Sequence, residues 1–132
     1  MSINQDHLSF EVSQDRIVFH EFVNDQGNLF GGHAMKWMDE VAYIAATRYT
    51  RQRMVTVSVE RVKYLLAIPL GSIVKVRAEM LSAGPVKLFI KTEIWLDVNK
   101  EPGSLKALEG RFVFAAVDDA GNPKRLISTG RN

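Results

Sequence analysis

The sequence contains no cysteine, few histidines and no long apolar run, and each absence excludes a class of protein. Without cysteine there is no disulfide framework, no thiolate metal site and no cysteine nucleophile. His7, His20 and His33 are scattered at spacings that match no metal-ligand motif. A Walker-type phosphate loop is also missing, which argues against nucleoside triphosphate chemistry. We therefore predict neither a bound metal nor another cofactor.

Charge is nearly balanced and is spread along the chain. The 17 basic and 15 acidic residues give a formal charge of +2, with no block of like charge that would mark a nucleic-acid arm or a membrane patch. The first thirty residues include Asp6, Glu11 and Asp15 and no unbroken apolar stretch, so they resemble neither a signal peptide nor a membrane span. We expect a cytoplasmic protein that binds neither nucleic acid nor membrane.

The length of the chain limits the number of domains. A chain of 132 residues with 46% hydrophobic side chains can bury one core but is too short for two ordinary domains. The segments rich in glycine and proline are short, and none has the length of an interdomain linker. We predict a single domain over residues 1–132.

The hydrophobic pattern changes from strand to helix and back to strand. Residues Arg16–Val23 are β-branched and aromatic and predict a strand. Residues His33–Tyr49 contain neither glycine nor proline and predict a helix. Alternating apolar and polar residues predict four more strands in an antiparallel meander, over Met54–Leu66, Ser72–Leu81, Val86–Val98 and Ala107–Asp118. This order predicts an α+β fold in which one helix covers a strongly curved antiparallel sheet.

The predicted helix is apolar around most of its circumference, yet it carries an acid, Asp39, at the border of the apolar face. A helix of this kind is buried on more than one side, either by a wrapped sheet or by a second subunit. One interpretation of Asp39 is a partly solvated carboxylate paired with Lys36 one turn earlier. The other is a carboxylate at the lip of an apolar pocket, suited to act as a general base or nucleophile.

Three residues that precede Asp39 in the sequence, Asn24, Gly31 and Gly32, help to choose between these interpretations. Gly31 and Gly32 stand where the helix begins, so their amides are free donors at the positive end of the helix dipole and could stabilise an oxyanion. Asn24, at the end of the predicted strand, offers an amide that could orient a water or a carbonyl. The glycines could equally make a tight turn, and Asn24 could cap it. Together, carboxylate, amide and bare backbone donors suit acyl transfer.

Four segments together resemble the acyl-CoA thioesterase family of the hotdog fold: NDQGNLFGG at 24–32, MKWMDE at 35–40, VTVSVE at 55–60 and PLG at 69–71. The resemblance spans most of the chain. It implies a long central helix wrapped by a curved antiparallel sheet of about five to six strands. It also implies hydrolysis of acyl-CoA to a fatty acid and free CoA. The family forms homodimers that share one continuous sheet, often assembled further into trimers of dimers.

The resemblance also implies roles for individual residues. Asp39 falls on the catalytic aspartate, Asn24 on the loop asparagine, and Gly31 or Gly32 on the backbone amide that polarises the carbonyl. In this family the acid of one subunit faces the asparagine and the glycine amide of the other. Asp39 either activates water or attacks directly to give a mixed anhydride, and the sequence does not separate the two routes.

Further residues are candidates for substrate binding. Thr56 could hydrogen-bond Asp39 or be an ordinary strand threonine, and Arg61 and Lys63 could either contact the CoA phosphates or point into solvent. Relatives often carry phenylalanine at the position of Tyr64 and a Gly-x-x-Ser turn at Gly84–Lys87, where Lys87 replaces the serine and could bind phosphate instead. Suspected walls of the acyl tunnel are Met35, Met38, Tyr43 and Phe89.

Two other functions remain open from the sequence. A hotdog hydratase or dehydratase would use a histidine with an acid. The candidate pair in this sequence is His33 with Asp39 or Glu40. A noncatalytic module could bind acyl-CoA without turnover. The products distinguish the first from a hydrolase, and tight CoA binding without thiol release identifies the second.

Overall fold

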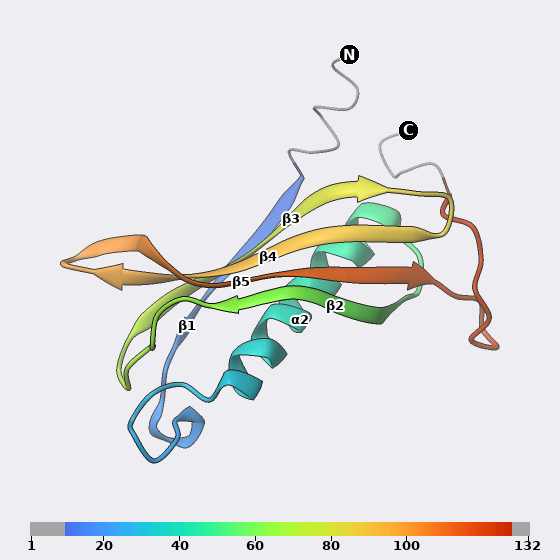
Figure 1. The fold of residues 1–132 in the computed structure, drawn as a ribbon. Coiled ribbons are helices and arrows are strands. Elements are labelled where there is room, and N and C mark those ends of the chain that lie inside the picture. Colours follow the sequence, from blue (N-terminus) through green and yellow to red (C-terminus); the bar gives the residue numbers. More distant parts are fainter. Residues whose placement is uncertain (1–9, 128–132) are drawn as a thin grey trace.

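The computed structural model describes residues 10–127 and shows a five-stranded antiparallel sheet curved around one long helix (Figure 1). The helix α2 spans Gly31–Thr50, and a short 3-10 helix, η1, spans His20–Phe22. The strands are β1 (Glu11–Ile17), β2 (Met54–Tyr64), β3 (Ile73–Ala83), β4 (Lys87–Val98) and β5 (Glu101–Ala116). The α+β architecture predicted from the sequence is confirmed. Residues 10–127 contain no helix that could span a lipid bilayer.

The order of the strands in the sheet differs from the predicted meander. Strands β3, β4 and β5 are neighbours, but β2 lies beyond β5 and β1 lies beside β3, giving the order β1-β3-β4-β5-β2. The link after β2 therefore crosses the sheet instead of forming a hairpin. It is held there by backbone hydrogen bonds to the loop before α2, from Leu29 N–H to the Ile68 carbonyl at 2.8 Å and from Leu70 N–H to the Gly27 carbonyl at 2.9 Å.

Several element boundaries also differ from the prediction. The first strand ends at Ile17 because the following residues turn into η1, so the predicted strand at Arg16–Val23 is wrong over most of its length. Strand β5 begins at Glu101 because Asn99 and Lys100 both adopt positive φ, 53° and 66°, and complete a two-residue hairpin turn. The link predicted between Val98 and Ala107 therefore belongs mostly to β5.

The core lies between α2 and the inner face of the sheet. Nine residues of α2 are buried, and all except the polar Thr50 belong to the predicted apolar face: Ala34, Trp37, Met38, Val41, Ala42, Ala45, Ala46, Tyr49 and Thr50. They pack against fully buried side chains of the sheet such as Leu88, Ile90 and Phe112. Each buried side chain of this size contributes about 1.5–3 kcal/mol of hydrophobic stabilisation, so this interface dominates the stability of the fold.

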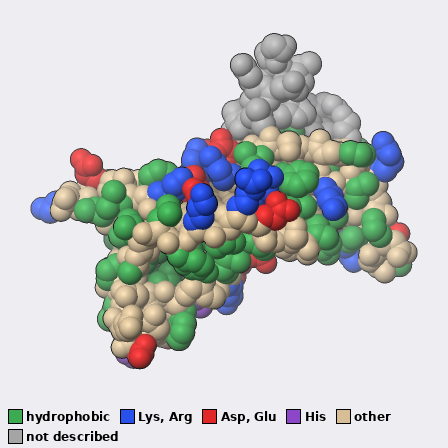
Figure 2. Space-filling view, in the orientation of Figure 1, with side chains coloured by type: hydrophobic (Ala, Val, Ile, Leu, Met, Phe, Trp, Pro, Cys, Tyr) green, Lys and Arg blue, Asp and Glu red, His purple; other side chains and the backbone are tan. Residues whose placement is uncertain are grey.

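The outer face of the sheet carries charges of both signs, intermixed over β3, β4 and β5 (Figure 2). Cross-strand pairing sets Arg77 opposite Glu93, Glu93 opposite Glu109, and Glu109 opposite Lys63. Glu93 is only 3% exposed and accepts hydrogen bonds from Arg77, Trp95 and Lys106 at 3.0–3.3 Å. The buried carboxylate is therefore paired, which burial of a charge requires.

Burial by itself raises the pKa of Glu93, but the hydrogen bonds from Trp95 and Lys106 and the charges of Lys91 and Lys106 outweigh it and hold the pKa below its ordinary value of 4.5. A hydrogen bond from Lys106 likewise lowers the pKa of Glu109. A carboxyl group whose pKa is lower in the folded chain contributes stability above its ordinary pKa. That contribution is lost as pH falls through the folded value.

We therefore expect the free energy of unfolding to fall as pH is lowered below about 4.5, the ordinary pKa of these groups. Glu93→Gln should cost about 2 kcal/mol at pH 7 and flatten this dependence, because the lost charge-assisted hydrogen bonds cannot titrate. Denaturant titrations of both proteins at one protein concentration, from pH 7 to pH 3, measure the effect. Parallel pH profiles for the two proteins would contradict the assignment.

Candidate active site

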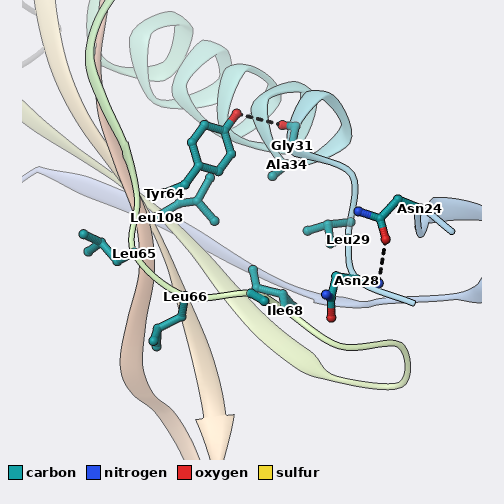
Figure 3. Close-up of a pocket in the computed structure, with 11 residues that line it drawn as sticks. Asn24, Asn28, Leu29, Gly31, Ala34, Tyr64, Leu65, Leu66, Ile68 and Leu108 are labelled. Atoms are coloured by element: carbon teal, nitrogen blue, oxygen red, sulfur yellow. Dashed lines mark hydrogen bonds between the residues drawn. The ribbon is translucent and has the colours of Figure 1, made fainter. Parts of the chain in front are cut away.

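The loop before α2 is held by the side chain of Asn24. Its Oδ1 accepts hydrogen bonds from the backbone N–H groups of Gln26 and Asn28, both at 3.0 Å (Figure 3). Because two donors converge on one atom, that atom is the amide oxygen, and the amide nitrogen is left at the rim of a cavity. The capping role and the catalytic role considered for Asn24 are thus compatible: the oxygen holds the loop, and the nitrogen can donate to a ligand.

The helix begins without a capping side chain. Phe30 is the N-cap residue and makes no side-chain cap hydrogen bond. The Ala34 N–H donates to the Phe30 carbonyl at 3.0 Å, but within residues 10–127 the amides of Gly31, Gly32 and His33 have no acceptor. Three free donors at the positive end of a 20-residue helix favour a negatively charged or polarised oxygen.

Of these residues Gly31, together with Asn24, lines a cavity of about 270 Å³ between the loop, the start of α2 and the end of β2 (Figure 3). No charged side chain lines it. Its polar side chains are Asn24, Asn28 and Tyr64, and the remaining lining residues are small or apolar: Leu29, Gly31, Ala34, Leu65, Leu66, Ala67, Ile68 and Leu108. The cavity therefore suits an apolar group with one polar end placed near the free amides.

Asp39 lies elsewhere on the same helix. It is half-buried, and its Oδ1 accepts a hydrogen bond of 2.8 Å from the Thr56 hydroxyl. It opens into a separate hollow of about 440 Å³ beside Tyr43 and Ile44. Eight residues at a rise of 1.5 Å per residue put Asp39 about 12 Å along the axis from Gly31. One chain alone thus does not bring Asp39 to the free amides.

The remaining candidates lie away from the cavity. Lys63 is on the outer face of the sheet, 3.9 Å from Glu109, and Arg61 lines a separate outer hollow with Lys91. The Gly84–Lys87 turn, closed by a hydrogen bond from Gly84 N–H to the Lys87 carbonyl at 2.8 Å, is at the opposite end of the sheet from the Asn24 loop (Figure 1). The cavity lining includes none of the suspected tunnel residues Met35, Met38, Tyr43 and Phe89.

His33 does not pair with an acid in the described part of the chain. Its ring stacks on Phe22 with centroids 4.2 Å apart and meets the edge of Trp37 at 5.2 Å. Glu40 instead lies 3.4 Å from Arg16. Within one chain, the histidine and acid that a hydratase would require are therefore not brought together.

Sequence reasoning missed the contact of Tyr64 with the start of the helix. The Tyr64 hydroxyl donates to the Gly31 carbonyl at 3.1 Å. A Cβ added to Gly31 would lie only 3.1–3.2 Å from three atoms of the Tyr64 side chain, whereas one added to Gly32 would meet nothing within 4 Å. The sequence did contain a signal for this contact. Side chains alternate between the two faces of β2, and this alternation sets Thr56 and Tyr64 on the face that packs against the helix.

With this fold and site, the chain belongs to the thioesterase superfamily, whose family model matches residues 26–102. The chain is 35% identical over 106 residues to the acyl-CoA thioester hydrolase YciA of Salmonella typhimurium, covering 78% of this chain and 80% of that protein. It is 37% identical over 107 residues to an uncharacterized acyl-CoA thioester hydrolase of Buchnera aphidicola, covering 79% of each chain.

Solved structures show the same fold. An acyl-CoA hydrolase from Staphylococcus aureus in complex with butyryl coenzyme A, coenzyme A and coenzyme A disulfide superimposes with a TM-score of 0.84 at 28% identity, covering 91% of this chain and 73% of that one. A hexameric thioesterase from Yersinia pestis superimposes with a TM-score of 0.81 at 30% identity, covering 87% and 93%. The predicted hotdog thioesterase fold is confirmed.

The two helix-start glycines give a matched pair of variants. We expect Gly32→Ala to raise the free energy of unfolding by about 0.5–1 kcal/mol, because alanine has the better helix propensity and the added methyl meets open space. The same methyl should lower thioester hydrolysis roughly tenfold or more by displacing the substrate from the amides. Gly31→Ala should gain less stability, because its methyl presses on Tyr64.

Thermal or denaturant unfolding and a hydrolysis assay measure both effects on the two variants. If Gly32→Ala hydrolyses thioesters as fast as the wild type, the open face of Gly32 is not part of the site.

Proposed function

We propose that this protein hydrolyses acyl-CoA thioesters to a carboxylate and free CoA, with Asp39 as the catalytic carboxylate and the amides of Gly31 and Gly32 as the oxyanion hole. The hydrolase relatives and the coenzyme A complexes of the Staphylococcus aureus enzyme support the substrate class. The observation that carries the residue roles is the combination of a carboxylate held by Thr56 with uncapped helix amides beside an apolar cavity.

The spacing of three residues supports the same roles. The Staphylococcus aureus hydrolase has been solved with an asparagine, an aspartate or a threonine replaced by alanine, and these residues are 15 and 17 positions apart in its sequence. Asn24, Asp39 and Thr56 have the same types, order and spacings in this chain. Residues selected for substitution in that enzyme thus match the three polar side chains proposed here.

Thioester chemistry suits so small a site. The leaving thiolate has a conjugate acid with a pKa of roughly 8.5, so it departs without a strong general acid. The free amides of Gly31 or Gly32 would stabilise the oxyanion, and the amide nitrogen of Asn24 would orient the water or the carbonyl. The Thr56 hydroxyl already donates a hydrogen bond to Oδ1 of Asp39. The other carboxylate oxygen is then available to accept a proton from water or to attack the carbonyl.

We further propose that two copies share each site. Asp39 and the free amides are about 12 Å apart along one helix, too far to act on one carbonyl. Strand β2 is at the edge of the sheet, and Val55 and Val57 on it are 42% and 50% exposed. Such an edge favours pairing with another strand. Antiparallel pairing of β2 with its own copy would bring Asp39 of one subunit toward the amides of the other.

The same pairing suggests where the CoA phosphates bind. It would set the Gly84–Lys87 end of one sheet near the Asn24 loop of the other, so we propose Lys87 as a phosphate contact. Arg61 and Lys63 lie on the outer face and are weaker candidates. Hexameric relatives support an assembly larger than the dimer, and a trimer of dimers is the arrangement we propose.

We expect wild-type protein to release thiol from one or more acyl-CoAs between acetyl and palmitoyl, and Asp39→Asn to reduce that release ~100-fold or more by removing the base or nucleophile. A thiol-reactive chromophore follows the reaction. Glu40→Gln, which neutralises the next carboxylate on the same helix, is the matched control. Its rate of thiol release should stay within about twofold of wild type, because the exposed ion pair of Glu40 with Arg16 contributes little to stability.

The outcomes separate the remaining functions. CoA binding without thiol release from any chain length would identify a binding module, and hydration products would identify a hydratase. Equal turnover by wild type and Asp39→Asn would exclude Asp39 as the catalytic group. Single-turnover hydrolysis in oxygen-18 water then separates the two routes, since only direct attack leaves label in Asp39.

A further inference from the structure

We infer that Tyr64 is a positioning residue for thioester hydrolysis, because it holds the first turn of α2 in the shape that presents the amides of Gly31 and Gly32. This inference rests on the proposed function. The side chain lies at the rim of the cavity, across from the Asn24 loop (Figure 3), and contacts the backbone of the helix start.

The first turn of α2 needs such support. Two consecutive glycines are poor helix formers, and no side chain caps the turn. A turn of this composition frays readily when nothing else holds it. An oxyanion hole nevertheless requires its donors to stay within about 0.5 Å of their working positions. The sequence thus leaves the amides free for a substrate but does not keep them in place.

Tyr64 supplies the missing support through two contacts with Gly31. Its hydroxyl donates to the Gly31 carbonyl at 3.1 Å. Its ring lies so close to the Gly31 Cα that an added Cβ would be 3.1 Å from Cε2 and Oη and 3.2 Å from Cζ. Only glycine permits this approach without a shift of the ring. The absence of a side chain at Gly31 and the presence of tyrosine at position 64 therefore form one matched contact.

The sheet in turn anchors Tyr64. It is the last residue of β2 and pairs with Leu108 of β5. The next two amides, of Leu65 and Leu66, both donate to the Ala107 carbonyl, at 2.8 and 3.2 Å. The backbone that carries the tyrosine is thus fixed on both sides of its Cα, and the side chain transmits that rigidity to the helix start.

The direction of the hydrogen bond separates positioning from catalysis. The phenol proton of Tyr64 is directed at the Gly31 carbonyl, so it is not available to protonate the departing thiolate. Tyr64 therefore acts on the reaction through the backbone of Gly31. This predicts an effect on the rate of the chemical step and on the order of the first turn, with little effect on substrate affinity.

The test is Tyr64→Phe, which keeps the ring and removes the hydroxyl. We expect kcat for acyl-CoA to fall roughly 3- to 10-fold with KM within about twofold, because the oxyanion donors lose their alignment. We also expect hydrogen exchange at the Ala34 amide, which closes the first turn by donating to the Phe30 carbonyl at 3.0 Å, to accelerate severalfold. Tyr43→Phe, which removes a half-exposed phenol from α2 far from its first turn, is the control for exchange and should leave the Ala34 amide unchanged.

A second pair of variants tests the matched contact. Gly31→Ala should reduce kcat more in the wild-type background than in a Tyr64→Ala background, where the added methyl no longer presses on a ring. Unchanged kcat and unchanged exchange in Tyr64→Phe would overturn the inference, and so would a loss of kcat without faster exchange. If wild-type protein releases no thiol, the proposed function fails, and the exchange measurement alone shows whether Tyr64 holds the turn.

Discussion

The arrangement of the site depends on two side-chain hydrogen bonds between the edge strand β2 and the helix α2. Thr56 donates to Asp39 at 2.8 Å, and Tyr64 donates to the Gly31 carbonyl at 3.1 Å. The rest of the contact between helix and sheet is largely apolar burial, which stabilises the fold strongly. Because the helix is apolar around most of its circumference, this burial does not fix its rotation or its register against the sheet. Directional bonds at both places fix the carboxylate and the free amides relative to one strand.

The same residues show what the proposed site costs in stability. A helix start with two glycines and no capping side chain is weaker than one with alanines and a serine cap, and the difference is of the order of 1–3 kcal/mol. The Asn24 loop compensates locally, since its side-chain oxygen accepts two backbone donors. An apolar edge on β2 carries a similar cost, because an exposed edge invites unwanted pairing unless a second copy covers it.

Much of the fold could be predicted from the sequence because its local signals are strong. The helix followed from a stretch free of glycine and proline, and the strands from alternation. The strand order could not be predicted, because alternation marks which residues face the core and not which strands are neighbours. Strand β5 was underestimated because Asn99 and Lys100 adopt positive φ without glycine. Of the site, Asp39 and Asn24 could be proposed from residue type and spacing, but the contact of Tyr64 with Gly31 depends on tertiary packing.

The central claim is that Asp39 of one subunit works with Asn24 of another. Subunit complementation tests it most directly: Asp39→Asn and Asn24→Ala proteins are each assayed for thiol release, then unfolded together, refolded and assayed again. Random pairing produces mixed dimers with one intact site each, so the account predicts recovery to about one quarter of wild-type activity from two nearly inactive proteins. A refolded mixture no more active than its components would contradict the shared site. It would mean that Asp39 and Asn24 act within the same subunit.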